Sequence, residues 1–228
     1  MLEVLYEDNH IIAVNKSNSD IVQADKTGDE TLVDQVKAYI KKKYNKPGDV
    51  FLGVVHRLDR PVSGVVLFAR TSKALSRLNQ MFVDKTIKKT YWAITQNRPP
   101  QIAEELHHYM SKNEEKNRAL VSVSPRTGYK EAILSYRLIG STQNLNLLEI
   151  ELKTGRHHQI RAQLARIGCP IRGDLKYGSK RSNEGGGINL HSRMIVFVHP
   201  VKNEPIKIVA PLPADNVWHV FGVEELKR

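Results

Sequence analysis

The segment His56-Arg57-Leu58-Asp59-Arg60 places one carboxylate between two arginines in a turn-rich connection. Ser63-Gly64 then introduces a continuous apolar run over 65–69, so a buried strand would anchor this loop. The flanking arginines would keep the carboxylate of Asp59 ionised through favourable charge interaction. Asp59 is therefore a candidate catalytic group, although the segment taken alone favours a simpler interpretation, an aspartate in an ordinary surface turn.

A second segment of interest is Gly155-Arg156-His157-His158-Gln159-Ile160-Arg161. The spacing predicts a helix over 157–167 whose buried stripe consists of Ile160, Leu164 and Ile167. At about 100° per residue, Arg161 lies about 60° from Leu164 and borders this stripe. We expect an arginine in that position to be partly buried and to need a carboxylate partner, for which Asp59 is a candidate.

The two histidines of this segment raise the question of a metal site. His157 and His158 are adjacent, so they do not share a helix face, and no third ligand lies at a suitable spacing. Cys169 is the only cysteine, which excludes an internal disulfide and a cysteine-based metal site. We therefore predict no metal site.

Tyr91 lies in the segment Lys88-Lys89-Thr90-Tyr91-Trp92-Ala93. A tyrosine on the inner face of a strand is more often a core residue than a catalytic one. Basic residues interleaved with aromatic ones also suit an RNA surface, where rings stack on unpaired bases. The pattern by itself leaves both interpretations open.

The composition describes a globular chain with a positive charge. The 228 residues fit one large domain, and 35 Lys and Arg against 24 Asp and Glu give a net charge of +11. This charge attracts polyanions, and its spread along the chain suits a folded surface laid against phosphates. No apolar run approaches the roughly 18–20 residues of a membrane span, and the N-terminus lacks a signal-peptide pattern. We therefore expect a cytoplasmic protein.

The elements that must position these residues are mostly strands. The alternation and length of apolar runs predict two hairpins, over 4–14 and 194–210, and strands over 65–69, 86–95, 132–138 and 148–152. Helical periodicity is found over 28–44, after Thr71 or Ser72, and over 157–167. These elements predict an α+β fold with a mixed, largely antiparallel sheet and flanking helices. The polar stretch around 100–130 is expected to be a projecting hairpin or a mobile arm.

The three candidate segments, in this order, resemble the RluA-type family of RNA pseudouridine synthases. The resemblance runs through most of the chain and continues in Gly173-Asp174-Leu175-Lys176-Tyr177-Gly178, Leu190-His191-Ser192 and His199-Pro200. It implies a single catalytic domain over 1–228 without a separate N-terminal RNA-binding module. It also implies an enzyme that converts specific uridines in rRNA or tRNA to pseudouridine without a metal or organic cofactor.

The resemblance implies a role for each candidate residue. Asp59 would be the nucleophile, attacking the flipped uridine at the base or at the ribose C1′. Tyr91 would pack against that base, and Arg161 would form an ion pair with Asp59. Residues of both motifs would bind the RNA substrate: His56, Arg57, Arg60, Arg156, His158, Gln159 and Ile160. The chain departs from the family's usual residues at Ser17, at Pro61-Val62, at His157 and at Gln163, which makes transfer of a relative's target site unsafe.

Two alternatives belong to different functional classes. A catalytically inactive RNA-binding or chaperone protein on the same fold would bind RNA without forming pseudouridine. A metal-dependent nuclease or phosphotransferase would also have a basic surface and acidic residues, but a chelator would abolish its activity. We predict the synthase, acting as a monomer on structured RNA, with no membrane partner.

Overall fold

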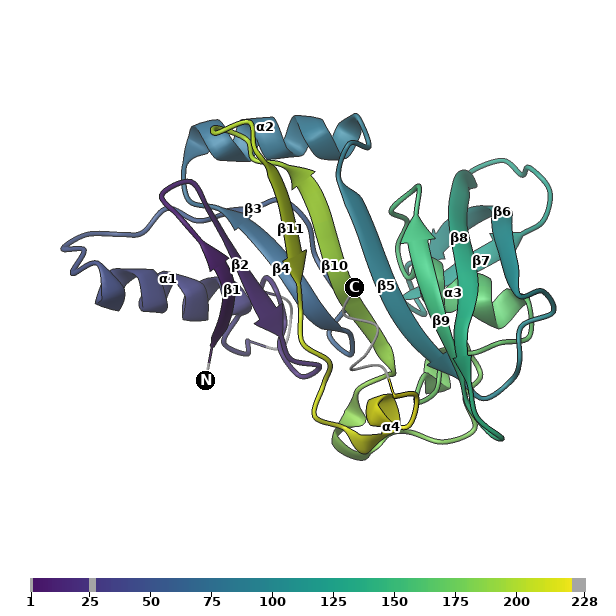
Figure 1. The fold of residues 1–228 in the computed structure, drawn as a ribbon. Coiled ribbons are helices and arrows are strands. Elements are labelled where there is room, and N and C mark those ends of the chain that lie inside the picture. The colour runs from purple at the N-terminus through teal and green to yellow at the C-terminus, as the bar shows by residue number, and fades with distance from the viewer. Residues whose placement is uncertain (1, 25–27, 223–228) are drawn as a thin grey trace. The chain divides into compact units, whose positions relative to one another are not determined.

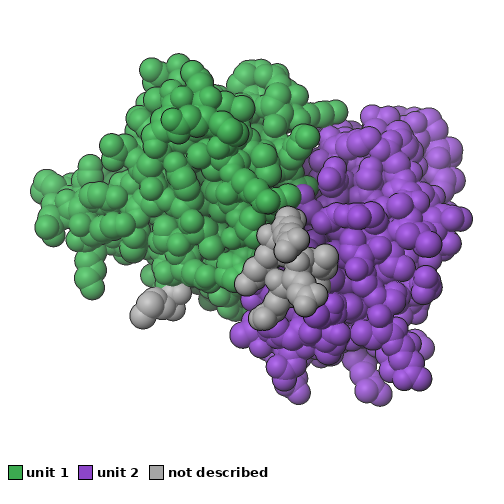
Figure 2. Space-filling model, viewed as in Figure 1, with its two compact units in different colours: residues 1–89, 192–211 green, residues 90–191, 212–228 purple. Residues whose placement is uncertain are grey.

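The computed structural model describes residues 2–24 and 28–222, arranged in two compact units (Figure 2). Unit 1 comprises residues 1–89 and 192–211, and unit 2 comprises residues 90–191 and 212–228. The sheet strands are mostly antiparallel and few helices accompany them, so the predicted α+β class is confirmed (Figure 1). Among the described residues, no helix is both long enough and apolar enough to cross a membrane.

Unit 1 is built on strands in the order β1-β2-β4-β10, with β3 beside β4 and β11 beside β10. Its strands are β1 (Glu3–Glu7), β2 (Ile11–Lys16), β3 (Gly53–Val54), β4 (Ser63–Ala69), β10 (Leu190–Val198) and β11 (Pro205–Val209). The predicted strand over 65–69 is part of β4, in which all seven residues are buried. Both faces of β4 are therefore covered, as its unbroken apolar run indicates.

The two helices of unit 1 begin at side-chain caps. Helix α2 (Ser72–Val83) begins after Thr71, whose hydroxyl accepts the N–H of Ala74 at 3.1 Å, as the sequence predicts. Helix α1 (Leu32–Lys43) begins after Thr31, which forms a capping box with Asp34. The helix is therefore shorter than the predicted 28–44, because the cap fixes its first turn four residues later.

Unit 2 contains strands in the order β5-β9-β8-β6-β7, all neighbours in this order being antiparallel. They are β5 (Lys88–Thr95), β6 (Ala103–Asn113), β7 (Arg118–Ser122), β8 (Lys130–Ser141) and β9 (Asn146–Leu152). Its helices are α3 (Gln159–Arg166), the short η1 (Leu175–Tyr177) and η2 (Glu184–Gly186), and α4 (Asn216–His219). One apolar cluster of this unit gathers Trp92, Ile94, Leu147 and Trp218.

The stretch around 100–130, expected to project or to be mobile, contains β6 and β7. These strands form a hairpin, and β6 also pairs with β8 along eight residues from Ala103 to Met110. Leu106, Met110 and Ala119 are buried, which gives the hairpin an inner face. The many charged residues between these apolar positions lie on the exposed face and at the turns, so they hid the alternation in the sequence.

Candidate active site

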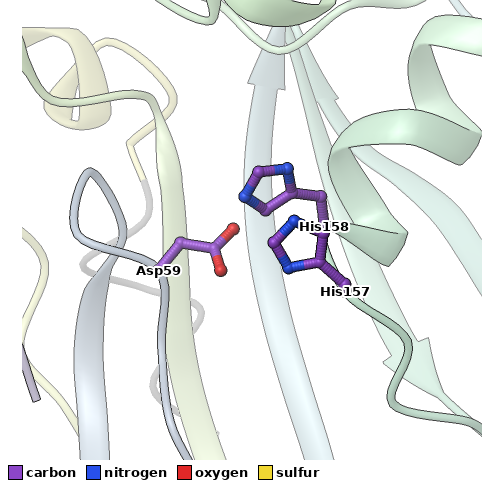
Figure 3. Close-up of side chains that lie close together, drawn as sticks. All are labelled: Asp59, His157 and His158. Carbon is purple, nitrogen blue, oxygen red and sulfur yellow. The ribbon is translucent and has the colours of Figure 1, made fainter. Parts of the chain in front are cut away.

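Asp59 lies in the loop between β3 and β4 in unit 1 and is half-buried (Figure 3). The backbone turns immediately after it, since the N–H of Val62 donates to the carbonyl oxygen of Asp59 at 3.0 Å. Leu58, the residue before it, is 8% exposed and anchors the loop in the apolar interior. A buried neighbour on one side and a tight turn on the other present the carboxylate from a restrained backbone.

Lys16, the last residue of β2, binds the backbone of this loop through its side chain. Its side chain is only 1% exposed, and its ammonium donates to the carbonyl oxygens of Ser17 (2.7 Å), Arg60 (2.9 Å) and Val62 (2.7 Å). All three N–H donors are thus used, two of them on the residues that follow Asp59. Burial lowers the pKa of Lys16 to about 8, and the nearby carboxylates of Asp20 and Asp59 partly oppose this shift. The sequence pattern did not single out Lys16, because a lysine ending a strand normally reaches solvent.

His56, predicted to contact RNA, ties the loop to β4. Its Nε2 accepts the backbone N–H of Leu67 at 3.0 Å, and its ring lies 5.4 Å from that of Phe82. Burial lowers the pKa of His56 to about 3, so the ring is neutral and Nε2 is a hydrogen-bond acceptor. The predicted contact of His56 with substrate stays a prediction.

The two arginines beside Asp59 extend to the surface. Arg57 is exposed, whereas Arg60 pairs with Asp29 at 2.9 Å with about half of each side chain accessible. An exposed pair of this kind contributes little to stability and is easily exchanged for another anion. Both arginines are therefore accessible to a phosphate, and their predicted binding of RNA stays a prediction.

Arg161 in unit 2 is buried, and its carboxylate partner within that unit is Asp174. Its Nε and Nη2 donate to the two carboxylate oxygens of Asp174 at 2.7 and 3.0 Å, and the side chains are 5% and 1% exposed. A bidentate pair at this depth fixes the guanidinium plane. The predicted Asp59–Arg161 ion pair joins residues of different units and stays a prediction.

Tyr177 completes the surroundings of Arg161. The guanidinium carbon of Arg161 lies 5.1 Å from the centre of the Tyr177 ring, and that of Arg118 lies 5.0 Å from it. The Tyr177 hydroxyl accepts the N–H of Ala119 at 2.7 Å and lies 2.9 Å from Nδ1 of His158. Asp174 and Tyr177 were not among the predicted site residues, although both belong to the motif Gly173–Gly178 that carried part of the resemblance.

The turn before α3 adopts a conformation that few residues tolerate. His158 has φ of 51° and ψ of 27°, in the left-handed region, and is 8% exposed. Its ring stacks on that of His157 with centroids 3.7 Å apart (Figure 3). The expected absence of a metal site stays a prediction.

The remaining predicted contacts of this segment have protein partners. Gln159 accepts from Thr154 at 2.8 Å and from the N–H of Arg156 at 2.9 Å, which closes the turn before the helix. Ile160 is 4% exposed in the interior of unit 2, and Arg156 donates to the carbonyl oxygen of Glu131. Their predicted contacts with RNA stay predictions.

Tyr91 and Gln163 are buried in unit 2. Tyr91 is 6% exposed on β5, in register with Ile150 of β9. Gln163, where the family often has histidine, lies on α3 and donates to the carbonyl oxygen of Ala132 at 3.1 Å. Its amide nitrogen also lies 3.0 Å from Nδ1 of His108, so it joins α3 to β6 and β8.

Comparison with known proteins identifies the family. A family model described as RNA pseudouridylate synthase matches residues 10–166, which include Asp59, Tyr91 and Arg161. The chain belongs to the RNA pseudouridylate synthase family. Its relatives place it in the RluA-type branch, as the sequence motifs indicate. The family assignment makes it an isomerase that acts on RNA.

Individual relatives agree with this assignment. An uncharacterised RNA pseudouridine synthase of Synechocystis is 32% identical over 216 residues, which cover 93% of this chain and 66% of that protein. The ribosomal large subunit pseudouridine synthase D of Zymomonas mobilis is 30% identical over 224 residues, covering 94% and 70%. The chain thus spans about two thirds of the length of these curated relatives.

A solved structure shows the same fold at low sequence identity. The human RNA pseudouridylate synthase domain containing 4 aligns with a TM-score of 0.79 and 21% identity, covering 99% of this chain and 93% of that one. At this identity the comparison shows the synthase fold alone. The fold and the family motifs therefore agree independently of each other.

Proposed function

We propose that this chain isomerises specific uridines of rRNA or tRNA to pseudouridine, with Asp59 as the nucleophile after base flipping. The observation that carries the proposal is the position of Asp59 inside the matched family region, on a loop restrained by Lys16. Relatives named ribosomal large subunit pseudouridine synthases support ribosomal RNA as the substrate. The same names support the expected cytoplasmic location.

The reaction is an isomerisation, so it needs no net oxidant or reductant. The bond between ribose C1′ and base N1 breaks, the base rotates, and C5 forms the new bond to C1′. The C5 proton leaves and N1 gains a proton. A carboxylate that attacks the base or C1′ splits this change into two easier steps, provided that it is held in place. The target base must leave its stack first, because its reacting atoms are inaccessible inside a helix.

The buried surroundings of Arg161 and Tyr91 support assigned roles for both. A guanidinium fixed by Asp174 is pre-organised to face a second anion, and we assign that anion to Asp59. A tyrosine ring on a rigid strand suits packing against the flipped base. The family model covers residues of both units, which supports treating 1–228 as a single catalytic domain.

The decisive experiment compares Asp59→Asn with the unchanged protein on ribosomal RNA. We expect pseudouridine formation to fall by about a thousandfold or more, because an amide is a poor nucleophile, while RNA affinity changes by less than about threefold. Asp49→Asn, which alters an exposed aspartate of the same unit, is the matched control and should leave both quantities unchanged. Mass-spectrometric mapping of pseudouridines across the stable RNAs, with and without the gene, identifies the target.

Two outcomes would overturn the proposal. Unchanged pseudouridine yield in Asp59→Asn would remove Asp59 from the mechanism. Absence of any lost pseudouridine in cells without the gene would favour the inactive RNA-binding alternative. Turnover should be indifferent to a chelator, since the proposed chemistry uses protein groups alone, whereas a metal-dependent nuclease would lose activity.

A further inference from the structure

The positive charge of unit 1 is concentrated in one short segment. The unit contains 18 Lys and Arg against 12 Asp and Glu. Residues 37–46 contain five lysines and no acidic residue. Outside this segment, the basic and acidic residues of unit 1 nearly balance. The segment comprises the last two turns of α1, the helix labelled in Figure 1, and the residues just beyond it.

Four of these lysines form an exposed surface that we call the lysine ridge: Lys37, Lys41, Lys42 and Lys46. The fifth, Lys43, pairs with Glu7 at 2.6 Å and so attaches α1 to β1. Tyr39 and Tyr44 donate to the same carboxylate at 3.0 and 2.8 Å. In the part of the chain that the structure describes, no ion pair involves a lysine of the ridge.

The fold has no need of the ridge. Leu32, Val36 and Ile40 form the buried face of α1. The helix dipole favours cations in the last turn, which accounts for Lys41 and Lys42 but not for Lys37 or Lys46. Lys37 and Lys41 lie one turn apart on the same face, about 6 Å along the axis, and repel each other. The dipole, and Asp34 through its attraction to Lys37, favour three of these lysines individually. Neither effect requires four lysines on one exposed surface, so a partner explains their concentration better than folding does.

We propose that the lysine ridge is a second RNA-docking surface, which binds backbone phosphates of the substrate away from the target nucleotide. The proposal rests on the proposed function only for the identity of the partner as RNA. Lysines act as point charges that neutralise phosphates without reading bases, so this surface would contribute affinity and orientation but no sequence specificity.

The same surface does not suit a membrane. An interfacial helix buries an apolar face among lipids, whereas the apolar face of α1 is already buried in unit 1. Tyr44, within the segment 37–46, is 41% exposed. Its hydroxyl donates to Glu7, and its ring is covered by Arg70 at 4.7 Å. A polyanion therefore fits the ridge better than a lipid surface does.

The experiment measures the salt dependence of binding to a fluorescently labelled duplex RNA of arbitrary sequence. The test variant replaces all four ridge lysines with glutamine, which preserves helix propensity. Each lost phosphate contact lowers the slope of log affinity against log salt by about 0.7–0.9, so we expect the slope to become shallower by about 3. Affinity near 0.1 M salt should fall tenfold or more. Replacing the same four lysines with arginine should keep the slope, because the charge remains.

The matched control replaces four other exposed lysines of unit 1 with glutamine: Lys73, Lys85, Lys202 and Lys207. It removes the same charge, so its slope should stay close to that of the unchanged protein if the ridge is the docking surface. An unchanged slope in the ridge variant, or an equal loss in the control, would overturn the proposal. The readout is binding alone, so it is independent of whether Asp59→Asn abolishes pseudouridine formation.

Discussion

Lys16 is as deeply buried as the apolar residues around it, yet it carries an ammonium group. Three carbonyl oxygens replace its water, and two of them belong to the loop that presents Asp59. An ammonium has three N–H donors, whereas a neutral amine has two, so deprotonation must release one carbonyl. The conformation of the Asp59 loop is thereby linked to the protonation of one buried group.

We expect the turnover of the enzyme to fall as pH rises through about 8, the value to which burial lowers the pKa of Lys16.

The effect on stability has the opposite sign. The folded pKa lies below the unfolded one, so between about 8 and 10.5 the unfolded chain binds more protons, and this group's contribution to the unfolding free energy rises with pH. Measuring kcat and urea unfolding over pH 7–10 tests both signs. In Lys16→Arg, which stays charged, the alkaline fall in kcat should vanish. Its persistence there would assign the fall to another group.

Asp174 illustrates a second effect at the residue scale. It is 1% exposed and compensates the charge of Arg161 through two hydrogen bonds. Removing one member of a buried ion pair leaves the other charge without compensation, which is more damaging than losing both members.

For Asp174→Asn we therefore expect a loss of about 3 kcal/mol in unfolding free energy, measured by urea denaturation. The control is Glu149→Gln, which breaks the exposed pair of Glu149 with Arg137 and should cost less than about 1 kcal/mol. Equal losses of unfolding free energy in the two variants would show that the buried pair contributes no more to stability than the exposed one. Pseudouridine formation should fall in Asp174→Asn alone, since it alone releases Arg161.

At the scale of elements, β4 connects the loop that presents Asp59 to the interior of unit 1. Gly64, its second residue, has φ of 112°, and a Cβ built there would lie 2.3 Å from the carbonyl oxygen of Ser192 in β10. The absence of a side chain at this position lets β10 pass close to the start of β4. A glycine is thus required immediately after the Asp59 loop for a reason of packing.

Gly64→Ala should destabilise the protein by about 3 kcal/mol or more, because it combines a disfavoured backbone conformation with a backbone clash. Gly48→Ala is the matched control, since a Cβ at Gly48 meets nothing within 4 Å. It should change the melting temperature by no more than a degree or two. If Gly64→Ala has the same melting temperature as Gly48→Ala, then β4 and β10 adjust to the added methyl group more easily than their contact indicates.

For the whole molecule, charge is informative in its distribution rather than in its total. A net charge of +11 indicates a polyanionic partner without showing where it binds. The structure shows that many basic side chains are already used within the protein: Lys16 on carbonyl groups, Lys43 on Glu7, Arg161 on Asp174. The lysine ridge stands out because none of its side chains forms an ion pair or a carbonyl contact of this kind with the described residues. It is where the salt dependence of RNA binding is expected to originate.

The sequence by itself determined the family, the fold class and most of the elements. Unbroken apolar runs such as that of β4, and caps such as Thr71, are local signals, so they can be recognised from the sequence alone. The motif around Asp59 and the family order of Asp59, Tyr91 and Arg161 needed no structure either.

Only the tertiary structure decided which partners the buried charged groups have. Arg161 needed a carboxylate, as predicted, but sequence could not choose Asp174, because that choice depends on how η1 packs against α3. The sequence did not indicate that Lys16 supports the Asp59 loop. Its partners are backbone carbonyl oxygens, which every residue has, so no residue type points to them. Likewise, the sequence offered a hairpin around 100–130 as one alternative but did not reveal its buried inner face, because charged residues mask the apolar positions. Local pattern determines elements, whereas the partners of buried polar groups depend on contacts between distant segments.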